Sequence, residues 1–158
     1  MNKVWIAALA GVAASLTVAA EQPPQLHIAD AWVRALPPTQ TNTAAYMTVT
    51  NRGETAVKIA GATADIAQTV ELHTTREIDG YMRMERLADL SVDPGEAVQL
   101  APGGMHFMLL QLSHMPLPGE TPRICLVLAA GGEVCVDAQV RKSAKASDGH
   151  DPHQHHHK

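Results

Sequence analysis

The 158-residue sequence is short of aromatic side chains, cysteine and charge. It has two Trp, two Tyr and one Phe, only two Cys, and 18% charged residues. Two cysteines exclude a disulfide-dense scaffold, and a formal net charge of −4 without a basic stripe argues against nucleic acid as a partner. The length and the 46% of hydrophobic residues still predict one compact domain rather than a disordered chain.

By contrast, the sequence is rich in His and Met, with nine and seven residues respectively. Imidazole and thioether groups both bind transition metals, although Met also fills irregular gaps in hydrophobic cores. Composition therefore allows either a metal site or a flexible core, and the spacing of these residues has to decide between them.

The first 20 residues have the pattern of a secretory signal peptide. Lys3 precedes an apolar run over residues 4–18, and Ala19 and Ala20 place small residues at the cleavage position. A membrane anchor is the alternative, but the run is short for a span of ~20 residues. We therefore predict export to a bacterial periplasm, with no stable membrane insertion after removal of the signal.

Apolar and polar residues alternate through residues 21–142, in short stretches separated by turns rich in Pro, Gly and Asn. This pattern predicts an all-β domain, an antiparallel sandwich or barrel of about nine short strands and no strong helix. The expected strands are 26–34, 43–50, 56–60, 69–75, 81–86, 97–100, 105–112, 123–128 and 133–140.

Residues 143–158 lack apolar periodicity and are predicted to form a flexible tail. The tail contains five His, namely His150, His153, His155, His156 and His157, and clustered imidazoles bind divalent transition metals. An expression tag is the alternative. Because only three of these His are consecutive and Lys158 closes the run, we favour a native tail with auxiliary metal ligands.

Two pairs of His and Met are spaced to meet on strands. A two-residue loop at Asp79 and Gly80 would make His73 and Met84 diagonal neighbours on one face of a hairpin. Because Leu72 would take the core side of its strand, both side chains should face outwards.

The second pair is His106 and Met108, which lie two residues apart and so point to the same side of a strand. Two imidazoles and two thioethers form a soft ligand set that suits Cu(I), whereas Zn(II) usually recruits thiolate, imidazole or carboxylate. We therefore predict His73, Met84, His106 and Met108 as copper ligands. Thioethers, unlike thiolates, are not lost to disulfides in an oxidising compartment.

These four residues form the pattern His-x10-Met-x21-His-x-Met, in which the chain resembles the periplasmic copper chaperones called PCu(A)C, formerly a domain of unknown function. The surrounding sequence agrees, above all Asp30-Ala31-Trp32-Val33-Arg34-Ala35 and the Pro-Gly-Gly-Met segment before His106. The resemblance covers residues 28–141. Thr74 stands where many relatives have a further Met, which leaves the four principal ligands in place.

The resemblance implies a cupredoxin-like, Greek-key β-sandwich that holds Cu(I) near its surface. It also implies delivery of copper for the binuclear copper centre of cytochrome c oxidase, with a copper-accepting oxidase subunit or a thioredoxin-like copper assembly protein as partner. A His-rich extension in relatives is associated with Cu(II). We accordingly expect the tail to capture Cu(II), which reaches the folded site as Cu(I) after reduction elsewhere.

Secondary predictions concern four further residues. A cross-strand disulfide between Cys125 and Cys135 is preferred to a redox-active pair, because no Cys-x-x-Cys motif is present. Met82 shares a strand face with Met84 but is expected to be packing filler, and Trp32 is expected in the core of the sandwich.

Other function classes find less support in the sequence. An electron-transfer cupredoxin needs two His, one Cys and a weak axial Met, and neither Cys lies in a His-containing loop. A general periplasmic copper buffer would use the same ligands without a dedicated recipient, and an adhesive sandwich would need none of them. We predict no enzymatic activity, because no nucleophile triad, paired acidic motif or phosphate loop is found.

Overall fold

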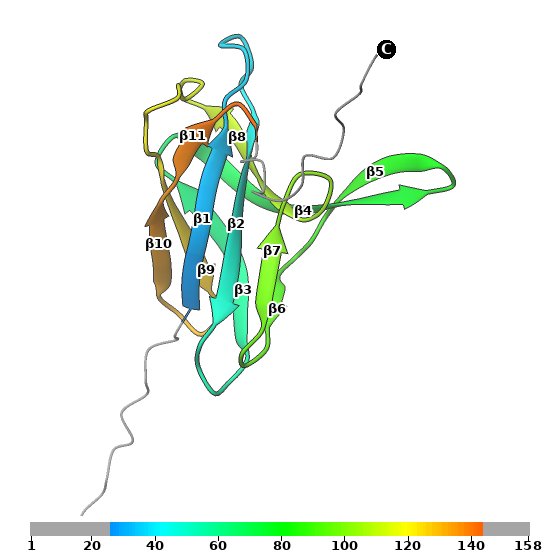
Figure 1. Cartoon of the computed structure of the whole chain (residues 1–158), viewed down its shortest axis with the longest axis vertical. Helices are drawn as coiled ribbons and strands as arrows, with labels where there is room; N and C mark the ends of the chain where they lie inside the picture. Colours follow the sequence, from blue (N-terminus) through cyan, green and yellow to red (C-terminus); the bar gives the residue numbers. More distant parts are fainter. Residues whose placement is uncertain (1–25, 144–158) are drawn as a thin grey trace, which may run out of the picture.

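The computed structural model describes residues 26–143, which form two facing β-sheets (Figure 1). The strands are β1 (Leu26–Arg34), β2 (Thr43–Asn51), β3 (Val57–Ala64), β4 (Ala67–Ile78), β5 (Tyr81–Arg86), β6 (Leu90–Val92), β7 (Ala97–Leu100), β8 (His106–Leu112), β9 (Arg123–Leu128), β10 (Glu133–Asp137) and β11 (Gln139–Arg141). No helix in this part of the chain could span a membrane. The prediction of an all-β sandwich is confirmed.

The larger sheet has the strand order β11-β1-β2-β8-β4-β5, and the smaller sheet has the order β10-β9-β3-β6. Strand β2 pairs with β8 through its first residues and with β7 further along. All pairings are antiparallel except that of β1 with β11, which is parallel. The predicted antiparallel sandwich thus contains one parallel pair, at this edge of the larger sheet.

The described residues contain eleven strands instead of the nine predicted. Strand β6 was missed because three residues are too few for an apolar alternation to stand out. The predicted strand 133–140 is two strands in different sheets, since β10 pairs with β9 and β11 pairs with β1. Buried Ala138 lies between them, where the chain changes sheets.

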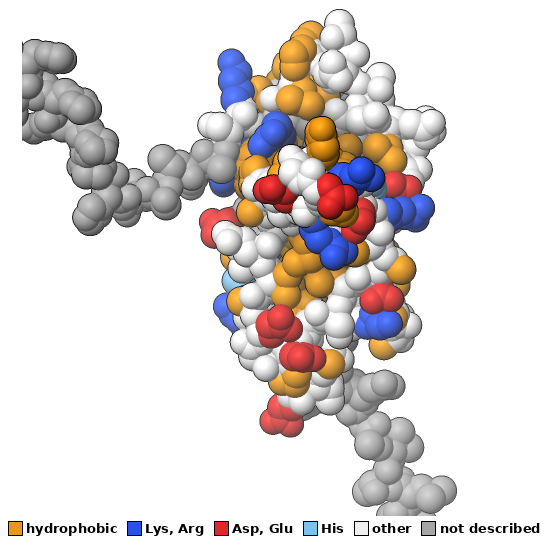
Figure 2. Space-filling model, turned by 90° about the vertical axis from the view of Figure 1, so that its right-hand side faces the viewer, with side chains coloured by type: hydrophobic (Ala, Val, Ile, Leu, Met, Phe, Trp, Pro, Cys, Tyr) orange, Lys and Arg blue, Asp and Glu red, His pale blue; other side chains and the backbone are white. Residues whose placement is uncertain are grey.

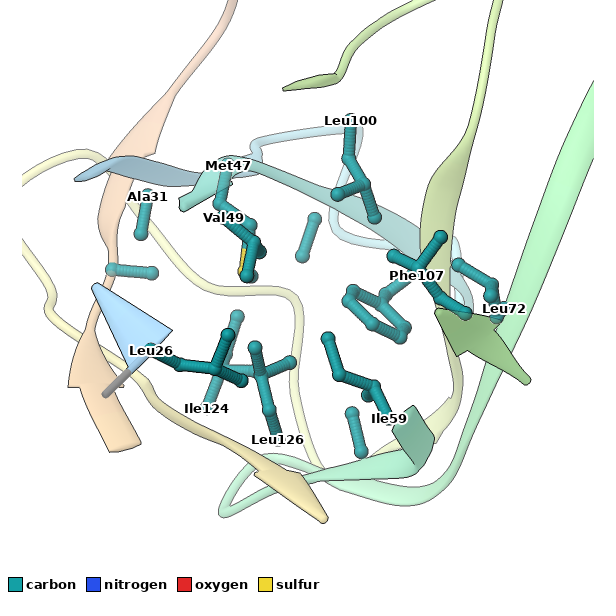
Figure 3. Packing of buried hydrophobic residues seen from close by; sticks show 14 of the residues in the cluster. Leu26, Ala31, Met47, Val49, Ile59, Leu72, Leu100, Phe107, Ile124 and Leu126 are labelled. Atoms are coloured by element: carbon teal, nitrogen blue, oxygen red, sulfur yellow. The ribbon is translucent and has the colours of Figure 1, made fainter. Parts of the chain in front are cut away.

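The main core fills the space between the sheets (Figure 3). Phe107 is the one aromatic ring among the buried residues of this core, and its exposed fraction is 0%. It points from the larger sheet towards Ile59 of β3, and Leu126 comes from β9 on the same smaller sheet. The remainder of the core is aliphatic, as the scarcity of aromatic residues requires.

A β-bulge in β1 reverses the expected orientation of Trp32. The register of β1 against β2 shifts between Ala29 and Trp32, and Asp30 takes a left-handed φ of 51°. The extra residue inverts the in-and-out alternation, so that Val33 enters the main core and Trp32 packs outside it with Tyr46. Trp32 is buried, as predicted, at 5% exposure, but it lies in a second cluster on the outer face and not in the core between the sheets.

Strands β4 and β5 form a hairpin that projects beyond the sandwich (Figure 1). Asp79 and Gly80 close it with φ values of 53° and 79°, the pair of positive angles that a type I′ turn requires. Six residue pairs follow, from Ile78 with Tyr81 to His73 with Arg86. The register is the one predicted from the sequence.

Removing the aromatic ring of the core should weaken the fold strongly. We expect Phe107→Ala to lower the free energy of unfolding by about 3–5 kcal/mol, because it leaves a cavity between the sheets. Urea denaturation measures this loss. Leu117→Ala is the control, since Leu117 is 59% exposed. Equal losses in the two variants would contradict the assignment of Phe107 to the centre of the core.

Candidate metal centre

The four predicted ligands lie on the outer face of the larger sheet, on three adjacent strands. His73 of β4 is directly opposite His106 of β8, and Met108 follows on the same face of β8. Met84 of β5 is opposite Thr75, the residue two positions after His73 on β4. Strand pairing thus brings residues 33 positions apart in the chain, His73 and His106, into register.

Each of the two imidazoles has one nitrogen already bonded and one without a bond. The Nε2 atom of His73 lies 2.9 Å from Oε2 of Glu71, whereas its Nδ1 is buried and has no hydrogen-bond partner. In His106, Nδ1 lies 3.0 Å from the carbonyl oxygen of Gly104, to which it donates. These bonds select tautomers in which His73 offers Nδ1 and His106 offers Nε2 as a ligand.

The two rings are close enough to share an ion. Their centroids are 6.1 Å apart and their planes are inclined by 40°. A metal bound to one nitrogen of each ring at about 2 Å fits between rings at this separation. A buried ring nitrogen without a partner is costly, and a metal at this position would satisfy Nδ1 of His73. The residues present therefore fit a soft metal ion.

Glu71 orients His73 from the same face of β4. Its Oε2 accepts the hydrogen bond of His73, and its Oε1 lies 3.1 Å from a guanidinium nitrogen of Arg86 on β5. The hydrogen bond from His73, together with the Arg86 charge, lowers the pKa of the Glu71 carboxyl below its ordinary value. A carboxylate behind a ligating imidazole fixes the ring and increases its basicity.

Aromatic rings border the site on the side of β1 and β2. Trp32 and Tyr46 stack with centroids 4.5 Å apart, and Met108 packs against them. Tyr46 is also 6.2 Å from the ring of His106, and the Arg34 guanidinium lies 5.4 Å from the Tyr46 ring. Burial raises the pKa of the Tyr46 phenol, an effect that Arg34 partly opposes. This cluster of Trp32, Ala44 and Tyr46 partly shields one candidate thioether ligand from water.

The methionines of the hairpin are exposed instead. Met84 is 54% exposed, as predicted for an outward-facing side chain, and Met82 is 62% exposed. The prediction of Met82 as packing filler is wrong, because a side chain exposed to this extent fills no gap. Figure 2 looks towards the side from which the hairpin projects, and shows acidic, basic and hydrophobic side chains gathered there.

Cys125 and Cys135 form a disulfide between β9 and β10. They are direct cross-strand partners with Cα atoms 4.0 Å apart. Together with Glu133 they are the one group of three His, Cys, Asp or Glu side chains in residues 26–143 whose ligand atoms lie close together. Disulfide sulfurs are not thiolates, so this group does not offer a metal site.

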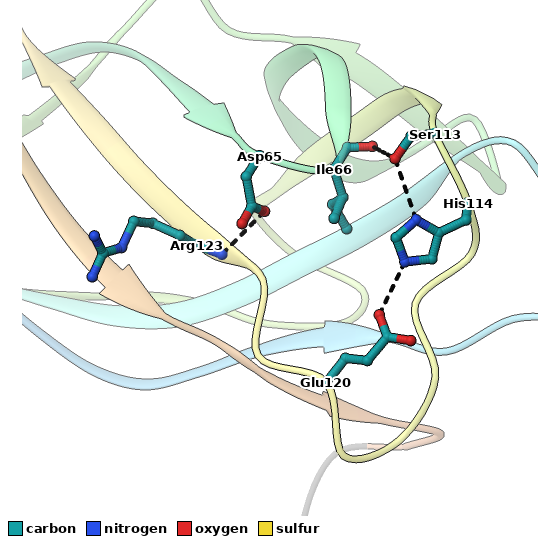
Figure 4. Close-up of polar contacts among 6 residues, drawn as sticks. All are labelled: Asp65, Ile66, Ser113, His114, Glu120 and Arg123. Carbon is teal, nitrogen blue, oxygen red and sulfur yellow. Dashed lines mark hydrogen bonds and ion pairs between the residues drawn. The ribbon is translucent and has the colours of Figure 1, made fainter.

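A further His lies in the loop between β8 and β9 (Figure 4). His114 bonds to Glu120 through Nε2 at 3.0 Å and approaches the hydroxyl of Ser113 through Nδ1 at 3.3 Å. Both ring nitrogens of His114 therefore have partners. These contacts stabilise the loop, and neither nitrogen is left free to bind a metal. The five His of the tail lie outside the described residues, so their role as auxiliary ligands stays a prediction.

Comparison with known proteins assigns the family. The model of LpqE-like proteins matches residues 26–140. The chain belongs to the LpqE-like family. This LpqE-like chain is 29% identical over 145 residues to "Putative lipoprotein Lxx21020" of Leifsonia xyli subsp. xyli, an alignment that covers 89% of this chain and 86% of the relative.

Solved PCuAC domains share the fold of the LpqE-like chain. The copper-bound PCuAC domain from PmoF2 is 28% identical with a TM-score of 0.60, over 73% of this chain and 92% of that domain. The solution structure of apo-DR1885 from Deinococcus radiodurans is 30% identical with a TM-score of 0.60, over 93% of this chain and 100% of DR1885. The Cu(I) form of DR1885 gives a TM-score of 0.56. These likenesses support a PCuAC-type family.

Reasoning from the sequence found the four candidate ligands but missed the groups around them. Glu71 could have been found, because it shares a strand face with His73. Trp32 and Tyr46 could not, since their outward position depends on the bulge in β1.

The lowered pKa of Glu71 predicts a pH dependence of stability. A carboxyl with a depressed folded-state pKa contributes stability above its unfolded pKa, and this contribution disappears as the pH falls through the folded pKa. The difference in unfolding free energy between the wild type and Glu71→Gln should therefore be constant near neutral pH and shrink below pH 4.5, the ordinary pKa.

Urea unfolding at a series of pH values measures this difference. Glu77→Gln, on the same face of β4, is the control for loss of a carboxylate from the hairpin. A wild-type advantage that does not change between neutral and acid pH would contradict the role of the ionised Glu71.

Proposed function

We propose that this protein is an exported copper chaperone that acts in the periplasm. It binds Cu(I) through His73, Met84, His106 and Met108 and delivers it for assembly of the binuclear copper centre of cytochrome c oxidase. The recipient is an oxidase subunit or a thioredoxin-like copper assembly protein. The signal peptide over residues 1–20 directs export, and the His-rich tail captures Cu(II).

The observation that carries the proposal is the pair of imidazoles between β4 and β8. His73 and His106 each have one nitrogen held by the protein and one open, and thioethers flank them on the same face. Neutral imidazole and thioether favour Cu(I) over Zn(II) or hard cations. The copper-bound PCuAC domain from PmoF2 and the Cu(I) form of DR1885 support the same choice of metal.

The arrangement suits a carrier because it combines a fixed part with an accessible part. His106 is 5% exposed and Met108 packs against the aromatic cluster, so both are held in place. Met84 is 54% exposed, so an incoming ligand of a recipient can replace it. The departure of Met84 leaves copper as Cu(I) and needs no proton transfer at the leaving sulfur, since a thioether carries no exchangeable proton.

The disulfide argues against the alternative of an electron-transfer cupredoxin. That site requires a Cys thiolate, and the two cysteines of the sequence are bonded to each other. A persistent disulfide also agrees with the proposed oxidising compartment. A general copper buffer differs from a chaperone in lacking a recipient, so transfer to an oxidase subunit distinguishes these two functions.

Removing a thioether ligand should weaken Cu(I) binding. We expect Met84→Leu and Met108→Leu each to lower the affinity by at least the ~10-fold that loss of an outer-shell partner typically costs. Competition with a Cu(I)-specific chelator under anaerobic conditions measures the change. Met105→Leu is the matched control, because Met105 packs against the main core. Affinities equal to that of the wild type in both ligand variants would reject the site.

The tail makes a separate prediction about Cu(II). A chain ending at Lys142 lacks His150, His153, His155, His156 and His157 and should bind at least one Cu(II) fewer than the full chain. Titration with Cu(II), followed by its visible absorption, gives the stoichiometry. Unchanged stoichiometry and affinity would remove the tail from the proposed function and leave the Cu(I) site unaffected.

A further inference from the structure

The two faces of the β4–β5 hairpin differ in chemistry. One face bears His73, Thr75 and Glu77 of β4 opposite Arg86, Met84 and Met82 of β5. The other face bears the ion pair between Arg76 and Glu85, with Tyr81 and Arg83. Both thioethers of the hairpin therefore lie on the face that carries His73.

Packing does not account for these thioethers. Tyr81, Met82 and Met84 are three of the five large hydrophobic side chains that are exposed among the described residues, and all three lie on β5. Neither methionine belongs to a buried cluster or packs against one. Scattered single hydrophobic residues are normal on a surface, but three on one six-residue strand are a concentration.

Met82 and Met84 occupy neighbouring positions on one face of β5. Residues i and i+2 of a strand are about 7 Å apart and point to the same side, so the two thioethers follow one another along the hairpin. Met has three rotatable bonds, so the Met82 side chain can reach towards an ion held at Met84. The order along the face is the imidazole pair, then Met84, then Met82 towards the hairpin turn.

We propose that Met82 is a transfer ligand, which takes Cu(I) from Met84 and presents it to an acceptor at the outer part of the hairpin. This inference rests on the proposed function of the site. In the transfer the bonds from Cu(I) to His73, His106 and Met108 break while Met84 still holds the ion and a bond to the Met82 sulfur forms. The bond to the Met84 sulfur breaks last, as the acceptor supplies its own ligands, and copper remains Cu(I) throughout. The acceptor is a molecule with soft sulfur or imidazole ligands, which replaces Met82 in turn.

The projection of the hairpin makes Met82 accessible to an acceptor. The type I′ turn at Asp79 and Gly80 and the ion pair between Arg76 and Glu85 stabilise an arm that extends past the sandwich (Figure 1). Met82, near the turn, can be approached without contact with the body of the protein, whereas His106 is buried in the sheet face. An acceptor therefore reaches Met82 before it reaches the imidazole pair.

The test separates the rate of transfer from the equilibrium affinity. The full chain is loaded with one equivalent of Cu(I), and transfer to bathocuproine disulfonate is followed by stopped-flow absorbance under anaerobic conditions. We expect Met82→Leu, which keeps the size of the side chain and removes the sulfur, to slow transfer several-fold without changing the Cu(I) affinity. Tyr81→Leu, on the opposite face of the same strand, should change neither quantity.

Any other result overturns the inference, and the outcomes differ in what they assign to Met82. A wild-type transfer rate in Met82→Leu removes the transfer role, and equal slowing in Tyr81→Leu assigns the effect to apolar contact with the chelator. A lowered affinity in Met82→Leu makes Met82 a resident ligand. If Met84→Leu and Met108→Leu also keep the wild-type affinity, the proposed site itself fails, so the two failures are distinguishable.

Discussion

The pairing of β4 with β8 is the contact on which both the core and the candidate site depend. Its register sets Leu72 against Phe107 on the inner face and His73 against His106 on the outer face. A shift by one residue would exchange the two faces, placing imidazoles in the core and the phenyl ring in water. The burial of Phe107 therefore holds the two imidazoles in register.

On the outer face, further side chains surround the candidate ligands and orient them. Glu71 forms a hydrogen bond with the imidazole of His73 and an ion pair with Arg86. Its carboxylate is therefore not left as an isolated charge. Trp32 and Tyr46 cover the opposite side and shield Met108. The site is consequently partly shielded on its β2 side and open on its β5 side, an asymmetry that suits the proposed holding and release of an ion.

The β4–β5 hairpin extends the open side of the site beyond the sandwich, and its two faces differ. One face carries the ion pair between Arg76 and Glu85, which stabilises the arm, while the other face presents two thioethers to solvent. A row of exposed soft donors contributes little to stability, because more than half of the surface of each side chain stays in water. It does have value for ligand exchange, which requires donors that an acceptor can reach.

Local patterns in the sequence were sufficient for the strands with clear alternation, for the hairpin at Asp79 and Gly80 and for the position of His73 and Met84 on one face of it, because turn type and strand period act over short distances. They did not reveal β6, which is too short, or the division of residues 133–140 between two sheets. The sequence by itself determined the soft chemistry of the four candidate ligands. Only the tertiary structure decided that Trp32 faces outwards, that His73 keeps a free Nδ1 and that Met82 is exposed, because these depend on a bulge and on contacts between strands distant in the chain.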